Sequence, residues 1–234
     1  MGFGLGFVTR DNGGASHTGP GFNLEMAVGI TRDIELGFRT GLRPTDDARF
    51  THADEYGRLF DRETDPYAAG NGAMANPEFR LRGALTRGQI AEVALEGRVV
   101  LPFATDAPIG NHTSVGLQAG LPIAIHAGRV ARFDTGIYIP IAFYDPAVVG
   151  FRVPLAVWFQ VSNKVWLGPI TGLYFTHIGG RQDFDRTDLL LGFGLGVSLS
   201  RNIDLKTMFL LPRVNDRDGA HVFGAGIGLQ FRIE

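Results

Sequence analysis

The chain has 234 residues, no cysteine and a formal net charge of −2. The lack of cysteine excludes disulfides, thiolate metal sites and thiol catalysis, and the near-neutral charge gives no basic footprint for nucleic acid. No run of about 18 apolar residues is present, which excludes a transmembrane helix, while the 33 glycines are about double the usual share of roughly 7%.

Apolar residues alternate with small or polar residues along most of the chain, which is typical of strands whose two faces meet different surroundings. The clearest example is 189–200, where leucine, phenylalanine and valine alternate with Gly192, Gly194 and Gly196. Such stretches exceed the about five or six residues of a usual soluble strand and match the about nine to eleven needed to cross a bilayer. We expect strands at 2–9, 21–31, 34–42, 77–86, 89–101, 113–125, 130–141, 149–161, 164–178, 189–200, 203–212 and 223–233.

The connections between these strands alternate in kind. Short turns are expected at 32–33, 87–88, 126–129, 162–163 and 201–202. Longer polar loops are expected at 10–20, 43–76, 102–112, 142–148, 179–186 and 213–220. Antiparallel neighbours send alternate connections to opposite ends, so we expect all short turns and both termini at one end of a single domain, 1–234. The longest loop, 43–76, either lies outside or folds into the lumen.

The apolar face of these strands meets either lipid or the core of a soluble barrel or sandwich. The opposite face is rich in glycine, which weakens exposed strands, and it carries nearly all the arginine and glutamate. An arginine on a lipid face would cost about 2–4 kcal/mol at the bilayer midplane. We therefore expect these residues to face lipid: Leu24, Phe38, Leu95, Leu117, Ile139, Leu155, Leu191, Phe193, Leu195, Phe209, Ile227 and Leu229.

The other face supplies the candidate functional residues, which would line a polar lumen and set ion selectivity. Alternatively, they pair across strands and fill the lumen, since about twelve strands falls between filled eight-stranded barrels and open sixteen-stranded ones. A slight basic excess indicates anion preference, and Glu92 and Glu96 are placed to pair with arginines of adjacent strands. The set is Glu25, Glu35, Arg39, Arg80, Arg82, Glu92, Glu96, Arg98, Gln118, Arg132, Asp134, Arg152, Asp204, Lys206 and Arg232.

The alternation does not assign the large aromatic residues to one face of the strands. In 164–178, Trp166, Ile170 and Tyr174 are large and mostly apolar, but they alternate with the residues of the apolar face. The set Tyr138, Tyr144, Trp158, Trp166 and Tyr174 either includes rings of an interfacial girdle or points inward, as the parity of some members indicates.

With this pattern, over nearly all of 2–233, the chain resembles the Gram-negative outer-membrane β-barrel proteins of the porin-like kind. The last strand alternates from Phe223 to Ile233, although Arg232, Ile233 and Glu234 stand where that family usually ends on an aromatic residue. The resemblance implies an all-β, closed, antiparallel up-and-down transmembrane barrel of about twelve strands, with short periplasmic turns and longer extracellular loops. It also implies contact with outer-membrane lipid, lipopolysaccharide and the barrel-assembly machinery. Met1 leads directly into the first strand without a signal peptide, so we expect a mature chain of the cell outer membrane.

The function expected from this resemblance is passive diffusion of small solutes or ions. One alternative is a non-conducting barrel that serves adhesion or acts as a scaffold, with 43–76 as its working surface. Another is a hydrolase at the outer rim, but the histidines are scattered and no G-x-S-x-G is present. We expect no catalytic residue, no metal site and no cofactor.

Overall fold

The computed structural model describes residues 1–11, 16–42, 77–101, 115–143, 147–178, 186–211, 214–215 and 223–232. Within them, no helix is long and apolar enough to cross a membrane. The strands are β1 (Gly2–Asp11), β2 (Ser16–Gly29), β3 (Ile34–Leu42), β4 (Glu78–Arg87), β5 (Ala91–Val100), β6 (Gly116–Ala127), β7 (Ala131–Ala142), β8 (Val148–Gln160), β9 (Val165–Ile178), β10 (Arg186–Ser198), β11 (Ile203–Leu211) and β12 (Phe223–Phe231).

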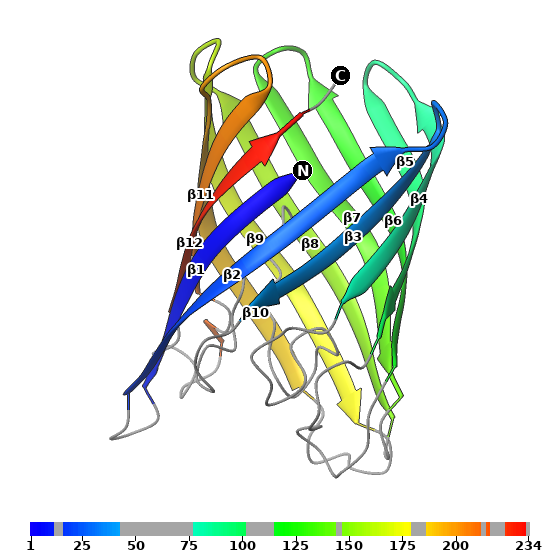
Figure 1. Cartoon of the computed structure of the whole chain (residues 1–234), viewed down its shortest axis with the longest axis vertical. Coiled ribbons are helices and arrows are strands. Elements are labelled where there is room, and N and C mark those ends of the chain that lie inside the picture. Colours follow the sequence, from blue (N-terminus) through cyan, green and yellow to red (C-terminus); the bar gives the residue numbers. More distant parts are fainter. Residues whose placement is uncertain are drawn as a thin grey trace.

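The strands form one closed barrel in which each strand pairs antiparallel with its neighbours in sequence. Closure is made by β1, whose Phe3 lies opposite Leu229 of β12 on one side and opposite Leu24 of β2 on the other. The short turns and both chain ends lie at the same end of the barrel (Figure 1). The predicted strand order, the closure and the short turns at one end are therefore confirmed.

Backbone hydrogen bonds close the short turns tightly. The amides of Ile30, Val161 and Leu199 donate to the carbonyls of the residues four positions later, at 2.8 to 2.9 Å. In the turn between β6 and β7, Gly128 has a φ of +64°, a conformation that costs glycine nothing and most other residues about 1–2 kcal/mol. We refer to this end of the barrel as the turn end.

The predicted loop 10–20 is wrong at both of its ends. β1 continues to Asp11 and β2 begins at Ser16, with Arg10 opposite His17. Glycine and proline lower the local strand preference, but hydrogen bonding to a neighbouring strand overrides a weak local preference. The predicted long loop 43–76 lies outside the described residues.

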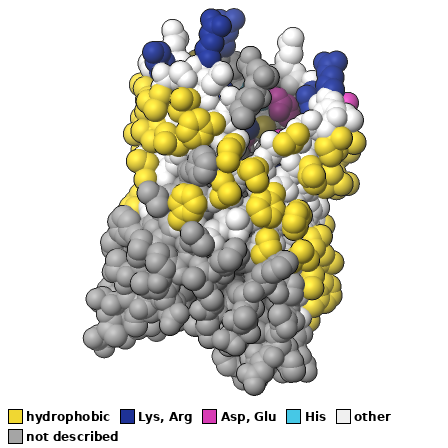
Figure 2. All heavy atoms as spheres, in the orientation of Figure 1, with side chains coloured by type: hydrophobic (Ala, Val, Ile, Leu, Met, Phe, Trp, Pro, Cys, Tyr) yellow, Lys and Arg dark blue, Asp and Glu magenta, His cyan; other side chains and the backbone are white. Residues whose placement is uncertain are grey.

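The two faces of the barrel wall differ as the alternation predicts. Large apolar side chains cover the outer face, where Leu95 is 58% exposed and Phe193 47%. Figure 2 shows these side chains over the outer surface of the strands, with lysine and arginine projecting at the turn end. The register places the predicted lipid-facing residues on this outer face, and Phe38 packs against Phe79 there, with ring centroids 5.2 Å apart.

Candidate functional site: the inner wall of the barrel

The strand register brings the predicted lumen residues onto one continuous inner face. Arg80 of β4 lies opposite Arg98 of β5, and Arg98 lies opposite Gln118 of β6. On the other side, Arg39 of β3 lies between Glu25 of β2 and Glu78 of β4.

One part of the inner face carries charged side chains, most of them joined in ion pairs. We call this part the charged wall: Glu25, Glu35, Arg39, Glu78, Arg80, Arg82, Glu96 and Arg98. Glu96, which is fully buried, accepts from Arg98 Nε at 2.6 Å and from Arg82 Nε at 3.2 Å. Arg98 also donates through Nη1 to Glu78 at 2.8 Å. Complementary charges at matching heights on β4 and β5 thus neutralise one another away from water.

Arg80 extends this network across a strand. Its Nη2 donates to Glu35 at 2.7 Å and its Nη1 lies 3.6 Å from Glu25, which is two strands away on β2. The side chain crosses β3 at Gly37, where an added Cβ would lie only 3.0 Å from Arg80 Nε. A glycine on the inner face therefore makes room for a long side chain.

The other side of the lumen is built from rings, which we call the aromatic wall: Tyr138, Trp158, Trp166 and Tyr174. An added Cβ at Gly120 would lie 2.4 Å from the Tyr138 ring, and one at Gly196 would lie 2.1 Å from the Trp166 ring. Tyr138 and Trp166 thus lie against inward-facing glycines of the adjacent strand. Of the two alternatives for these aromatic residues, the register supports the inward one for these four. Tyr144 lies outside the described residues.

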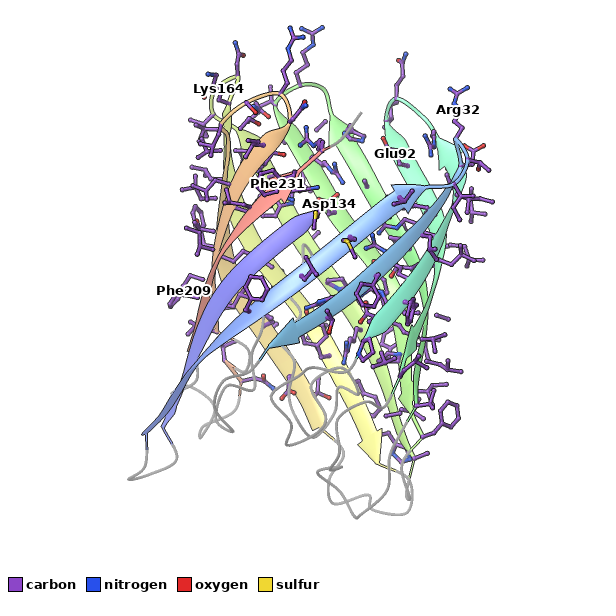
Figure 3. The ribbon with its side chains drawn as sticks, viewed as in Figure 1. Arg32, Glu92, Asp134, Lys164, Phe209 and Phe231 are labelled. Carbon is purple, nitrogen blue, oxygen red and sulfur yellow. The ribbon has the colours of Figure 1, made fainter. Side chains whose placement is uncertain are left out.

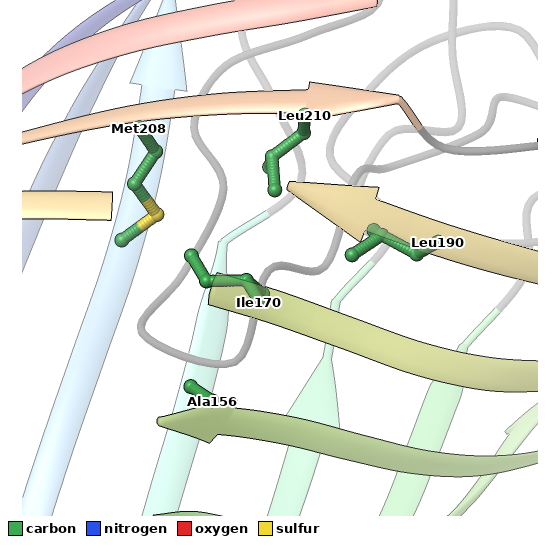
Figure 4. Close-up of a cluster of buried hydrophobic side chains, with 5 residues drawn as sticks. All are labelled: Ala156, Ile170, Leu190, Met208 and Leu210. Atoms are coloured by element: carbon green, nitrogen blue, oxygen red, sulfur yellow. The ribbon is translucent and has the colours of Figure 1, made fainter. Parts of the chain in front are cut away.

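Beneath these rings, apolar side chains form a cluster inside the barrel (Figure 4). Ile170, Leu190 and Leu210 are each no more than 1% exposed, and Trp158 and Tyr174 pack against the cluster, which also contains Ala156 and Met208. This cluster was not predicted from the sequence, because the whole inner face was expected to be polar. The parity of Ile170, which opposed the apolar face of its strand, was the available signal.

Two cavities open on the inner side at the turn end, each of about 370 Å³. The first, which we call the tryptophan cavity, is bordered by Arg132, Asp134, Trp158, Trp166, Lys206 and Arg232. The second is bordered by Glu35, Arg82, Arg87 and Glu92, and it shares Arg132 and Asp134 with the first. Figure 3 labels Glu92 and Asp134 on the inner side toward this end.

The remaining predicted residues have mixed partners. Glu92 lies 3.3 Å from His126 Nε2, so it is Glu96 that joins the arginine network. Arg152 stacks over the Tyr174 ring at 5.8 Å, and Asp204, which is buried, pairs with Arg232 and accepts from Ser198 Oγ at 2.8 Å. Arg132 donates to Asp134 at 2.6 Å.

Two buried acidic residues of the inner face, Glu78 and Asp188, were not among the predicted lumen residues. Both follow the inward parity of their strands and could have been found by it. When they are added to the predicted set, its acidic members equal its basic members. The basic excess of the predicted set, which indicated anion preference, therefore disappears when these two residues are included.

No group of three metal-ligating side chains occurs in the described ranges. Of the histidines, His126 lies at the turn end of β6 and His177 near the far end of β9. The hydrolase hypothesis stays a prediction.

Solved structures of similar architecture include outer-membrane porins and channels at low sequence identity. The NanC porin has a TM-score of 0.62 at 10% identity, over 99% of this chain and 100% of that chain. The KdgM porin in complex with disordered oligogalacturonate has a TM-score of 0.60 at 6% identity, over the whole of both chains. An outer membrane channel from Pseudomonas putida F1 has a TM-score of 0.63 at 9% identity, over 98% of this chain and 94% of that chain.

By sequence, no family model and no curated protein matches the chain. The chain is therefore related to these proteins by its structure alone, and the similarity extends over nearly the whole chain. The chain has the fold of the outer-membrane porins and channels.

Proposed function

We propose that this protein is an outer-membrane channel through which small polar solutes or ions diffuse. The observation that carries the proposal is a closed twelve-stranded barrel with an apolar exterior, charged residues on its inner face and two cavities that open on the inner side at the turn end. Its fold is shared with porins and with an outer membrane channel. Polar lumens of this kind conduct when side chains do not fill them.

The proposal includes the surroundings of the barrel. The apolar outer face contacts the lipid and lipopolysaccharide of the outer membrane, the short turns lie in the periplasm, and assembly requires the barrel-assembly machinery. Short turns on the periplasmic side and longer loops outside are the usual arrangement of such barrels.

Conductance across a planar lipid bilayer tests the channel. We expect stepwise current increments when the refolded full chain is added. We also expect Arg132→Ala to raise the single-channel conductance, because Arg132 borders both cavities. Arg201→Ala, at an exposed turn position, is the matched control and should leave the conductance unchanged. Absence of stepwise current from correctly folded protein would reject the channel.

A second candidate is a non-conducting barrel used for adhesion or as a scaffold. The observation that favours it is the burial of the inner face: Glu96, Arg98, Leu190 and Leu210 are all at most 5% exposed, as in a filled interior. The same bilayer recording separates the two functions, since a filled barrel inserts without current.

A further inference from the structure

Both tryptophans of the protein border the tryptophan cavity. Trp158 lies against Gly194 and Trp166 against Gly196, where an added Cβ would be 2.5 Å and 2.1 Å from the rings. The two glycines are on the same strand, β10, whereas the indoles come from β8 and β9, which pair with each other. Both rings therefore lie over one small patch of wall. Each ring is only half-buried, which leaves part of it available to a solute.

Among the described residues that border the cavity, two cations have no counterion: Lys206, and Arg129 in the exposed turn between β6 and β7. Asp134 is paired with Arg132, and Asp204 with Arg232. Lys206 of β11 lies opposite Gly196 of β10. It makes no hydrogen bond or ion pair with any described residue. Arg132 and Arg232 keep about half of their side chains exposed, at 50% and 55%. The tryptophan cavity is therefore net positive beside an aromatic surface.

The second cavity offers a contrast in the same barrel. Its lining includes Glu35, Glu92 and Asp33 as well as Arg82 and Arg87, and it contains no aromatic ring. The combination of an aromatic surface with an unpaired cation thus distinguishes the tryptophan cavity from its neighbour. Its volume of about 370 Å³ falls within the roughly 300–1,000 Å³ of small-molecule sites, which typically combine apolar surface with a few polar groups.

We propose that the tryptophan cavity is a binding site for a small cyclic carboxylate. The ring of the solute stacks on the indoles of Trp158 and Trp166, and its carboxylate accepts a charge-assisted hydrogen bond from the ammonium group of Lys206. The proposal deepens the channel function, on which it rests for the access of solutes to the lumen. It assigns the selectivity to one site at the turn end rather than to the overall charge of the wall.

Intrinsic tryptophan fluorescence reports directly on this site, because the protein has no other tryptophan. The full chain, folded in detergent micelles, is titrated with benzoate, cyclohexanecarboxylate, acetate and benzyl alcohol. These four probes separate the ring from the charge, and the first two separate an aromatic ring from a saturated one. We expect a saturable change in emission with benzoate or cyclohexanecarboxylate, and at least about tenfold weaker binding of acetate and benzyl alcohol, because each lacks one of the two contacts.

The two lysines of the chain provide a matched pair of variants. Lys206→Gln is expected to weaken carboxylate binding about tenfold, and Lys206→Arg to preserve it. Lys164→Gln, at an exposed turn between β8 and β9 (Figure 3), should leave the affinity unchanged. In the unaltered protein, bound benzoate should protect Lys206 but not Lys164 from an amine-acylating reagent, as measured by mass spectrometry, so the test does not depend on a variant that folds.

Three results would overturn the site. They are equal binding of acetate and benzoate, an unchanged affinity in Lys206→Gln, and benzoate that protects Lys206 from acylation no more than it protects Lys164. These outcomes are independent of the bilayer recording. A conducting protein without saturable binding retains the channel and loses the site, whereas binding without conductance retains the site and rejects the channel.

Discussion

The charged wall on β2–β5 and the aromatic wall on β7–β9 both occupy the inside of a closed sheet, but they do so with different side chains. The charged wall places carboxylates and guanidiniums at matching register, so that Glu96 serves both Arg82 and Arg98. The aromatic wall places rings against glycines, as Trp166 lies against Gly196. The difference shows that the inner face is not one uniform polar medium.

The two walls depend on different physical terms. A buried ion pair contributes little by comparison with a well-packed apolar pair, but removal of one partner leaves an uncompensated charge and costs several kcal/mol. A ring packed on a glycine depends on volume, and an added methyl group costs less, because side chains can shift. Substitutions in the two walls should therefore differ in size.

The largest effect is expected from the loss of the shared carboxylate of the charged wall. Glu96→Gln should lower the free energy of unfolding by about 3–5 kcal/mol, because Arg98 is 4% exposed and would lose one of its two carboxylate partners. Urea-induced unfolding in lipid vesicles, followed by circular dichroism, measures this change. Glu92→Gln is the control on the same strand. Glu92 is 53% exposed, so less than about 1 kcal/mol is expected, and equal effects would show that the network is not buried.

An intermediate loss of stability is expected when an arginine is placed on the apolar outer face of the barrel, which is common to both walls. Leu95 faces outward and is 58% exposed, whereas its neighbour Ala94 borders the second cavity on the inside. Leu95→Arg should cost about 2–4 kcal/mol if this part of β5 lies within the bilayer, and Ala94→Arg should cost clearly less. The yield of folded protein inserted into vesicles measures the difference, and equal yields would contradict the assignment of inside and outside.

The smallest of the three effects is expected in the aromatic wall. Gly196→Ala places a methyl group within 2.1 Å of the Trp166 ring in its present position, so the ring must move at a cost of about 1–3 kcal/mol. The shift should also change the wavelength of tryptophan emission. Gly97→Ala, where no atom lies within 4 Å of the added Cβ, is the matched control. A loss of stability in Gly97→Ala as large as in Gly196→Ala would mean that strand glycines matter for a reason other than ring packing.

Alternation along the chain predicted most of the fold and much of the candidate site. β3 begins and ends where it was expected, at Ile34 and Leu42, because period two is a local property of the residues. The same parity predicted that Arg80 and Arg98 share a face. It failed at 10–20, where glycine and proline suggested a loop and strand pairing decided otherwise.

Parity assigns a residue to a face but not to a partner. Arg80 reaches Glu25 across β3 because Gly37 lies between them, and nothing local to these three residues requires that contact. The inward rings were predicted only as one of two alternatives for the same reason, since an indole suits a membrane interface and a glycine-lined wall equally well.

The order of residues alone determined that this chain forms long strands with one apolar face and one face of small or polar residues, because side chains alternate across any extended backbone. Only the closed sheet decided which inner residues meet, because the relative register of neighbouring strands sets which side chains are adjacent. The apolar cluster around Ile170 and Leu190, the ion pairs of Glu96 and the tryptophan cavity are all consequences of that register.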